Sequence, residues 1–222
     1  MSTIDTQPGT RWRRRKIARP AEILDAALAS FAEHGYAATR LDDVAARAGV
    51  TKGTLYLYFR NKEDLFKAVV RQELVPILER GEAMIAASQA SSPALLEQLL
   101  GTFAQILGSS LSAIPKLVLT EAGNFPDLAR FYLEEVVERG KALFRRVLER
   151  GIDAGEFRPV DADSTVMCII APLLLATLWR HSFELHSGRR LDADALWRTE
   201  IDLLARALVL DPGEKPSGRG DL

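Results

Sequence analysis

The stretch from Thr39 to Leu65, TRLDDVAARAGVTKGTLYLYFRNKEDL, constrains the fold of this chain more than any other. Apolar residues fall at helical spacing on one face between Leu41 and Ala48, which predicts a first short helix there. Gly49 follows, and glycine can take the left-handed conformation that ends a helix without a steric penalty. Thr51 is a suitable N-cap for a second helix over residues 52–58. The stretch therefore predicts two short helices joined by a sharp glycine turn.

The start of the second helix is suited to a flat, anionic partner. It carries Lys52, Gly53 and Thr54, which are cationic or small and leave room for close approach. A short helix after such a turn is the arrangement that places a recognition helix in the major groove of DNA. Spacing alone leaves an alternative open, because a hairpin of this kind can also be a structural corner.

A longer motif favours the DNA-binding interpretation. The run A-x-x-A-G-V-T-K-G-T-L-Y-x-Y-F-x-N-K-E-D-L, from Ala45 to Leu65, closely resembles the DNA-binding domain of TetR-family transcriptional regulators. Leu57 occupies a position that varies in that family. The resemblance implies DNA contacts at the matching positions, and we add Gly53 for close approach and Tyr58 at the end of the recognition helix. The predicted DNA-binding set is Thr39, Arg40, Thr51, Lys52, Gly53, Thr54, Tyr56, Tyr58 and Lys62.

Charge is distributed unevenly along the 222 residues. Residues 1–67 hold 12 Lys and Arg against 8 Asp and Glu, whereas the remainder holds 17 against 22. An excess of positive charge at one end is expected of the part that binds nucleic acid. The chain thus has its basic part where the motif lies.

Cysteine usage and hydropathy bear on the compartment. The single cysteine, Cys168, excludes an internal disulfide and fits a reducing cytoplasm. No signal peptide is visible. The longest uncharged apolar run, Val166 to Trp179, is shorter than the roughly 20 residues that a membrane span needs. We therefore expect a cytoplasmic protein without a membrane segment, and a buried helix at this run.

The pattern along the chain predicts an all-α protein with two domains. Residues 1–19 are expected to be a flexible basic arm, because the charges in RWRRRKIAR repel one another. Residues 20–67 are expected to form a three-helix helix-turn-helix domain, with Pro20 in the first helical turn and Gly35 ending the first helix. Residues 68–210 are expected to form a helical ligand-binding and dimerisation domain. The tail, residues 211–222, is expected to be disordered.

The second domain shows helical patterns throughout. A long helix from Asn61 to about Gln89 should be kinked at Pro76, because proline lacks the amide that bonds the Gln72 carbonyl. Further helices are predicted over residues 94–109, 112–122, 126–154, 163–187 and 192–210. The segment EAGNFPDLARFYLEEVVERGKALFRRVLERGIDAGEFRP resembles C-terminal domains of TetR proteins in the AcrR and AefR-like groups, which implies a possible link to an efflux operon.

The residues give little support to an enzyme. The chain has three histidines, one cysteine and none of the HExxH, GxSxG or phosphate-loop motifs. His181, Glu184 and His186 are poorly spaced for a metal site on one helical face. We predict no catalytic residue, no metal and no cofactor.

The C-terminal helices instead offer apolar volume beyond what one helix layer requires, which makes a ligand cavity plausible. Each of these residues could also be ordinary core. Thr120, Asn124 and Tyr132 are possible polar anchors. The predicted pocket residues are Phe103, Ile106, Leu107, Leu111, Leu117, Thr120, Phe125, Phe131, Tyr132, Met167, Cys168 and Trp179.

The last two helices indicate a second copy of the chain. The run from Val166 to Trp179 is apolar all round, and the final helix carries two apolar stripes, one for the domain and one for a partner. The predicted dimer interface is Leu174, Trp197, Ile201, Leu204 and Leu208.

These observations favour a homodimeric repressor that binds double-stranded operator DNA and is released by a small apolar or amphipathic ligand. Two alternatives remain at this point. One is a helical enzyme with a DNA-binding appendage, and the other is a DNA-binding module regulated only through protein contacts.

Overall fold

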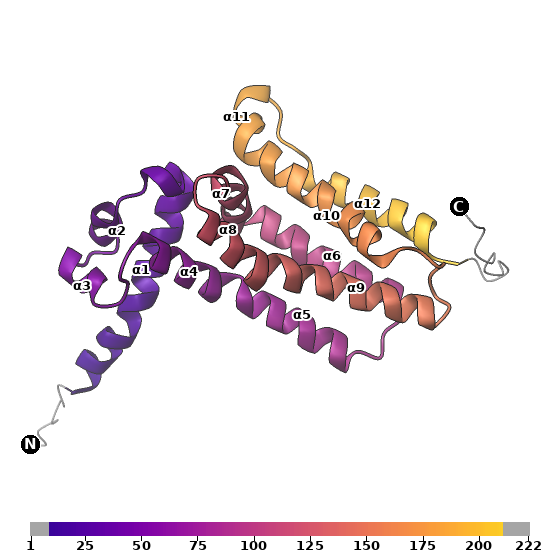
Figure 1. Ribbon diagram of the computed structural model, residues 1–222, viewed down its shortest axis with the longest axis horizontal. Helices are drawn as coiled ribbons and strands as arrows, with labels where there is room; N and C mark the ends of the chain where they lie inside the picture. The colour runs from indigo at the N-terminus through magenta and orange to yellow at the C-terminus, as the bar shows by residue number, and fades with distance from the viewer. Residues whose placement is uncertain (1–8, 211–222) are drawn as a thin grey trace, which may run out of the picture. The chain divides into compact units, whose positions relative to one another are not determined.

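The computed structural model describes residues 9–210, which fold into two compact units (Figure 1). The units separate between Glu73 and Leu74. The sequence predicted this boundary after residue 67. In the structure the first unit extends to Glu73, so it contains the whole of the helix that begins at Lys62. The tail expected to be disordered, residues 211–222, lies outside the described residues, as does the beginning of the expected arm.

The first unit is a small helical domain. Its helices are α1 (Gly9–Ala38), α2 (Leu41–Arg47), α3 (Lys52–Tyr56) and α4 (Lys62–Glu73). The predicted end of the first helix is confirmed, because Gly35 has φ 78° and ψ 172° inside the span of α1. The part of the expected arm that the structure describes, from Gly9 onward, has a helical backbone. Pro20 lies inside α1 instead of in its first turn.

An aromatic cluster holds α1 against α4. The rings of Phe31 and Tyr36 stack at 5.7 Å, and both meet Phe66 edge-on at 5.4 and 5.7 Å. Val44 and Ala45 from α2 and Leu55 from α3 are also buried. Neither short helix is long enough to be stable alone, so these buried side chains hold both in place.

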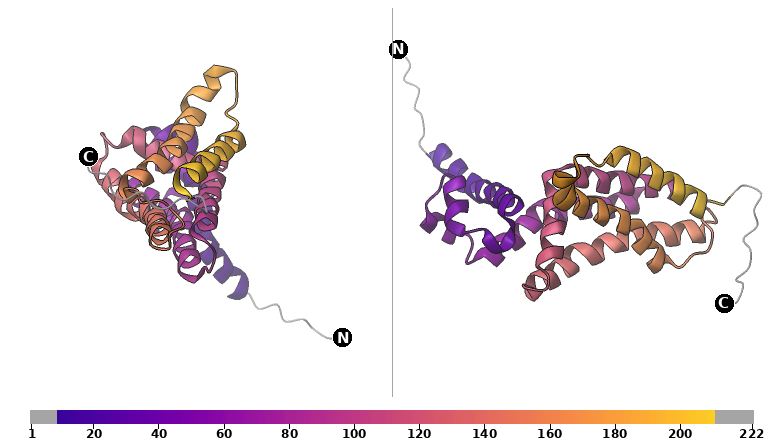
Figure 2. Two further views of the ribbon diagram at one scale, coloured as in Figure 1. Left: turned by 90° about the vertical axis from the view of Figure 1, so that its right-hand side faces the viewer. Right: turned by 90° about the horizontal axis from the view of Figure 1, so that it is seen from above.

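The second unit is a bundle of longer helices (Figures 1 and 2). Its helices are α5 (Val75–Ala87), α6 (Ser92–Gly108), the 3-10 turn η1 (Ser110–Ser112), α7 (Ala113–Glu121), α8 (Pro126–Tyr132), the π-helical turn η2 (Leu133–Val137), α9 (Glu138–Asp153), α10 (Ala162–Leu178), the π-helical turn η3 (Trp179–Phe183), α11 (Glu184–Ser187) and α12 (Ala193–Leu208). The helix pattern predicted from the sequence is confirmed in order and closely in extent.

The core of the second unit lies where α6 and α9 pack together, with α5 on one side and α10 and α12 on the other (Figure 1). Phe144 and Phe157 are its largest buried side chains. Gly151 is required for this packing, because a Cβ there would lie 2.0 Å from the ring of Phe157. An isolated antiparallel bridge between Phe157 and Val209 ties the end of α12 to the same core.

The predicted kink of the long helix is confirmed as a break. α4 ends at Glu73 and α5 begins at Val75, with Pro76 in the first turn of α5. Proline suits that position because its missing amide would have no helical partner there.

The helix that contains the apolar run near residue 170 is less buried than expected. It spans the 22 residues Ala162–Phe183 and contains an 18-residue window of mean hydropathy 1.7, enough in length and composition to cross a membrane, yet one such helix is weak support for a span. The prediction that this helix is buried is wrong for one face. Met167, Leu175 and Phe183 are all more than half exposed.

Candidate functional site

The predicted glycine turn between α2 and α3 is present. Gly49 has φ 66°, and the amide of Val50 donates to the Ala45 carbonyl at 3.0 Å. The Thr51 hydroxyl accepts a hydrogen bond from the Thr54 amide at 3.2 Å, which makes Thr51 the N-cap of α3. The turn and the cap together fix the direction of α3.

The outer face of α3 is free to meet a partner. Leu55 is buried and holds the helix, whereas Thr51, Lys52, Gly53 and Tyr56 are exposed. The Lys52 ammonium lies 2.8 Å from an Asp42 carboxylate oxygen, and this hydrogen bond raises the pKa of Lys52. Thr54 and Tyr58 are half-buried. Six of the nine predicted DNA-binding residues thus gather on or beside one short helix.

Sequence reasoning missed Leu57. Its side chain is 82% exposed directly after α3, next to Tyr56 at 45%. A large apolar side chain that is this exposed can contact a thymine methyl group in the major groove. The motif alone gave no signal for this residue, since its position varies.

Thr39 is placed differently from the prediction. Its side chain is 5% exposed, and its hydroxyl donates to the carbonyls of Gly35 at 2.6 Å and Ser30 at 3.2 Å. The side chain therefore orders the connection between α1 and α2 and is not offered to DNA. Arg40 next to it is exposed and stays a candidate contact.

Lys62 also has a structural role. Its ammonium donates to the carbonyls of Tyr36 at 2.7 Å, Ala37 at 2.9 Å and Thr39 at 3.2 Å, and lies 4.7 Å from the centre of the Tyr36 ring. Lys62 is one of the predicted DNA contacts, but three backbone carbonyls at the end of α1 and in the connection to α2 already accept hydrogen bonds from its ammonium.

The second unit contains a cavity of about 570 Å³ between α5, α6, α7, α8, η2, α9 and α10. Its walls are almost entirely apolar. Four of the predicted pocket residues, Phe103, Ile106, Leu107 and Tyr132, line it. Residues that the prediction lacked include Leu78, Met84, Val118, Val136, Ile170 and Leu174.

The other predicted pocket residues lie elsewhere, for identifiable reasons. Leu117 and Phe131 are buried in the packing of the unit, and Leu111 and Phe125 are half-buried outside the lining. Met167, Cys168 and Trp179 are exposed on the bare side of α10 and η3. A helical period cannot say which of two apolar faces a cavity adjoins, so these residues were assigned to the wrong face.

Of the three predicted polar anchors, Tyr132 lines the apolar cavity and Thr120 and Asn124 do not. Tyr132 is deeply buried, and burial raises the pKa of its phenol, which stays a neutral donor and acceptor. Thr120 instead donates to its own helix at the Leu117 carbonyl, and the Asn124 amide donates to Glu121.

The predicted dimer stripe faces inward. Leu208 is 3% exposed, and Trp197, Ile201 and Leu204 pack against the core, while Leu174 lines the apolar cavity. The exposed apolar side chains lie on other faces of α10, η3 and α12: Met167, Leu175, Trp179, Phe183 and Leu203. The last helices therefore carry exposed apolar surface, but the α12 residues predicted for the dimer interface pack within the unit.

Comparison with known proteins decides the family. The model of the tetR family of bacterial regulatory proteins matches residues 23–69, and that of the tetracyclin repressor-like C-terminal domain matches residues 91–208. The chain belongs to the TetR family. This TetR-family protein is a DNA-binding transcriptional regulator.

Individual relatives share most of its length. The transcriptional repressor KstR2 of Rhodococcus jostii is 34% identical over 144 residues, which are 64% of this chain and 70% of that protein. The structure of FadR from Bacillus subtilis in complex with stearoyl-CoA has a TM-score of 0.70 and 25% identity, and covers 83% of this TetR-family protein and 96% of FadR. The ketosteroid regulator KstR2 of Mycobacterium tuberculosis has a TM-score of 0.68 and 26% identity, with 87% and 96% covered.

Proposed function

We propose that this TetR-family protein is a repressor that leaves its operator when an elongated apolar ligand of the acyl-CoA or steroid class fills the apolar cavity. The observation that carries the proposal is the cavity of about 570 Å³, with almost entirely apolar walls and the phenol of the buried Tyr132 in its lining. Pockets of this size and composition hold small ligands, and a few polar groups fix their orientation.

The relatives support the ligand class. FadR of B. subtilis was solved with stearoyl-CoA, and KstR2 of M. tuberculosis is a ketosteroid regulator. Arg80 and Lys141 stand in the lining of the cavity and could meet the anionic part of such a ligand. These relatives favour target genes of lipid metabolism, while control of an efflux operon stays a prediction.

The division of labour follows the two units. Residues 9–73 would bind DNA through α3 and its surroundings, and residues 74–210 would hold the ligand and the second copy. In this account the protein works in the cytoplasm and catalyses no reaction. Arg40, Thr51, Lys52, Gly53, Thr54, Tyr56, Leu57 and Tyr58 form the proposed DNA-binding set.

A mobility-shift assay on the intergenic DNA beside the gene tests the proposal. Stearoyl-CoA should release the wild-type protein from this DNA, whereas free CoA should not. Met84→Trp, which fills the cavity, should retain DNA binding but need at least tenfold more stearoyl-CoA for release. The matched control is Ala83→Trp at the adjacent, exposed position of α5.

Two outcomes would contradict the proposal. Binding that is insensitive to stearoyl-CoA and to a steroid-CoA thioester would remove this ligand class. Equal release of wild type and Met84→Trp would remove the cavity as the site.

A further inference from the structure

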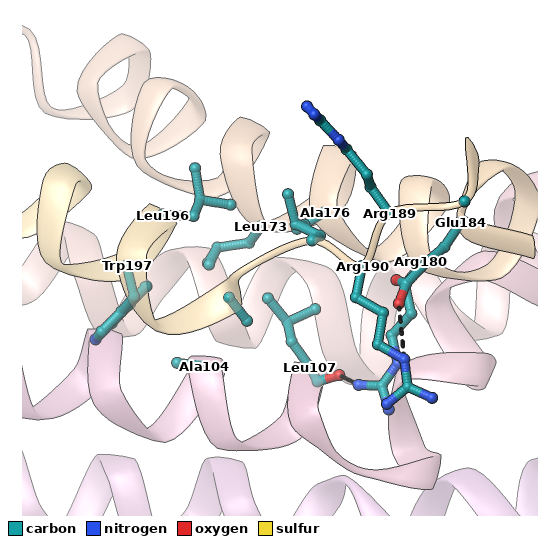
Figure 3. Close-up of a pocket in the computed structure, with 13 residues that line it drawn as sticks. Ala104, Leu107, Leu173, Ala176, Arg180, Glu184, Arg189, Arg190, Leu196 and Trp197 are labelled. Atoms are coloured by element: carbon teal, nitrogen blue, oxygen red, sulfur yellow. Dashed lines mark hydrogen bonds and ion pairs between the residues drawn. The ribbon is translucent and has the colours of Figure 1, made fainter.

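The second unit contains another cavity, which the repressor mechanism above does not use. It has a volume of about 610 Å³ and lies between α6, α10, η3, α12 and the connection that follows α11 (Figure 3). Part of its wall is apolar, with Leu107, Leu173, Leu196 and Trp197. In contrast to the apolar cavity, its opposite end is lined by Arg180, Arg189 and Arg190 together with Glu184.

The guanidinium of Arg180 is held in place at this end. Its Nη1 donates to the Leu107 carbonyl, near the end of α6, where helix carbonyls lack a partner within the helix. A guanidinium has five N–H donors in a fixed plane, so this one bond leaves others for a ligand. Arg180 comes from the π-helical turn η3, and such turns are frequent at functional sites.

Arg190 lies on the same side as Arg180 (Figure 3). Its Nε is 4.0 Å from a Glu184 carboxylate oxygen, which is too long for a hydrogen bond. Arg189 points away from the two in the same view. Two guanidinium groups, those of Arg180 and Arg190, therefore lie near one carboxylate, so this end of the cavity carries an excess of positive charge.

The pKa of the neighbouring His181 reflects the same positive charge. Burial lowers the pKa of its imidazole, and Arg180 and Lys116 lower it further against the opposing effect of Glu184. Its Nε2 lies 2.9 Å from the Ser112 hydroxyl, which itself donates to the Ser109 carbonyl at 2.8 Å. Neutral His181 therefore donates to Ser112, and the positive charge at this end of the cavity comes from the arginines.

We propose that this second cavity binds a small organic anion, whose carboxylate or phosphate meets Arg180 and Arg190 and whose apolar body lies against Leu107, Leu196 and Trp197. Bidentate pairing with such groups is the particular strength of arginine. Leu107 and Leu173 line this cavity and the apolar cavity alike. A ligand in the second cavity would thus share a wall with the proposed inducer and modulate its affinity.

Matched probes test the head group. Calorimetry would compare octanoate, octyl phosphate and the neutral octanamide on the full chain at low salt, with 2-naphthoate and 2-naphthamide as a rigid pair. At least one anion should bind at least tenfold more tightly than its neutral partner. The carboxylate and phosphate probes show which anion the site prefers.

Variants locate the site. Arg180→Gln/Arg190→Gln should reduce the advantage of the anion below threefold, whereas Arg198→Gln, on the exposed side of α12, should leave it unchanged. Because Arg180 also bonds the end of α6, Arg190→Gln alone is the second test. The Arg190 side chain is 96% exposed, so its loss cannot unfold the unit. Arg190→Gln should at least halve the advantage of the anion over its neutral partner.

Three results would overturn the inference: no saturable binding of any anion up to millimolar concentration, equal binding of anions and amides, or an unchanged advantage in Arg190→Gln and the double variant. The inference concerns a different cavity from the proposed function. Release of DNA by stearoyl-CoA in the double variant, with anion binding lost, would separate the two.

Discussion

Two side chains that appear in the sequence as surface charges are tied to the folded structure at the residue scale. Lys62 binds three backbone carbonyls of the α1–α2 connection, and Glu200 is buried on α12 without a hydrogen-bond partner among residues 9–210. Sequence position identifies neither role, because both depend on which groups the fold brings near.

Lys62→Ala should destabilise the first unit by about 1–3 kcal/mol, because it removes the donor of three carbonyls that are partly shielded from water. Lys52→Ala is the matched control, since the Lys52 side chain is 60% exposed and pairs only with Asp42 among the described residues. Urea unfolding of the two variants checks this. Equal stability of the two variants would show that the three hydrogen bonds of Lys62 contribute nothing to the free energy of unfolding.

Glu200 should make stability depend on pH. Burial raises the pKa of its carboxyl to about 7 from 4.5, so folding favours the protonated form. The contribution of the protonated Glu200 side chain to the stability of the fold is fully present below pH 4.5. It is lost as the pH rises through about 7. Glu200→Gln should therefore be more stable than wild type at pH 8, by roughly 1–3 kcal/mol, and no more stable at pH 4.

Unfolding at the two pH values measures the difference, with the exposed Glu97→Gln as a control that should show none. A pH-independent gap between wild type and Glu200→Gln would mean that folding does not raise the pKa of Glu200.

The decisive element is α3, because its exposed face combines polar, cationic and apolar side chains on a helix fixed by one buried leucine. Tyr56→Ala and Leu57→Ala should each weaken operator binding by about 1–3 kcal/mol if they contact bases. Their melting temperatures should stay at the wild-type value, since both side chains are exposed.

Salt dependence separates the kinds of contact. Lys52→Ala should lower the slope of log K against log salt by about 1.8 in a dimer, at about 0.9 for each phosphate contact, whereas Leu57→Ala should leave the slope unchanged. Fluorescence anisotropy at several salt concentrations gives both values. An unchanged slope for Lys52→Ala would place its ammonium away from phosphate.

Elements were predictable from the sequence to the extent that local signals specify them. The turn at Gly49, the cap at Thr51 and the break at Pro76 follow from backbone preferences that need no tertiary information. Which face of each helix is buried does not follow from such preferences. α10 is apolar all round, so its period could not separate the cavity residue Leu174 from the exposed Leu175. The helical start at Gly9 was also missed, because charge repulsion was given more weight than the helix propensity of arginine.

At the scale of the whole molecule, the bare faces of α10, η3 and α12 are where we propose that two copies meet. Leu175, Trp179 and Phe183 recur every four residues and so lie along one side of the helix, and Met167 lies about two turns before Leu175. Apolar surface of this kind on a soluble protein marks an interaction site.

Leu175→Glu/Leu203→Glu should therefore yield monomers that bind the two-fold operator poorly, because charges would be buried in the interface. Ala86→Glu, on the exposed side of α5, should remain dimeric. Sedimentation at micromolar concentration distinguishes the outcomes. A dimeric double variant would place the interface elsewhere.

The central claim is that a ligand in the apolar cavity and operator DNA oppose each other. A ligand shifts the protein away from DNA only if it binds the DNA-free arrangement more tightly, and the coupling must be reciprocal. The most direct measurement is calorimetric titration of the dimer with stearoyl-CoA, with and without saturating operator. The account predicts that operator weakens stearoyl-CoA binding by the factor by which stearoyl-CoA weakens operator binding, about 5- to 150-fold. Equal affinities for stearoyl-CoA in the two titrations would contradict it.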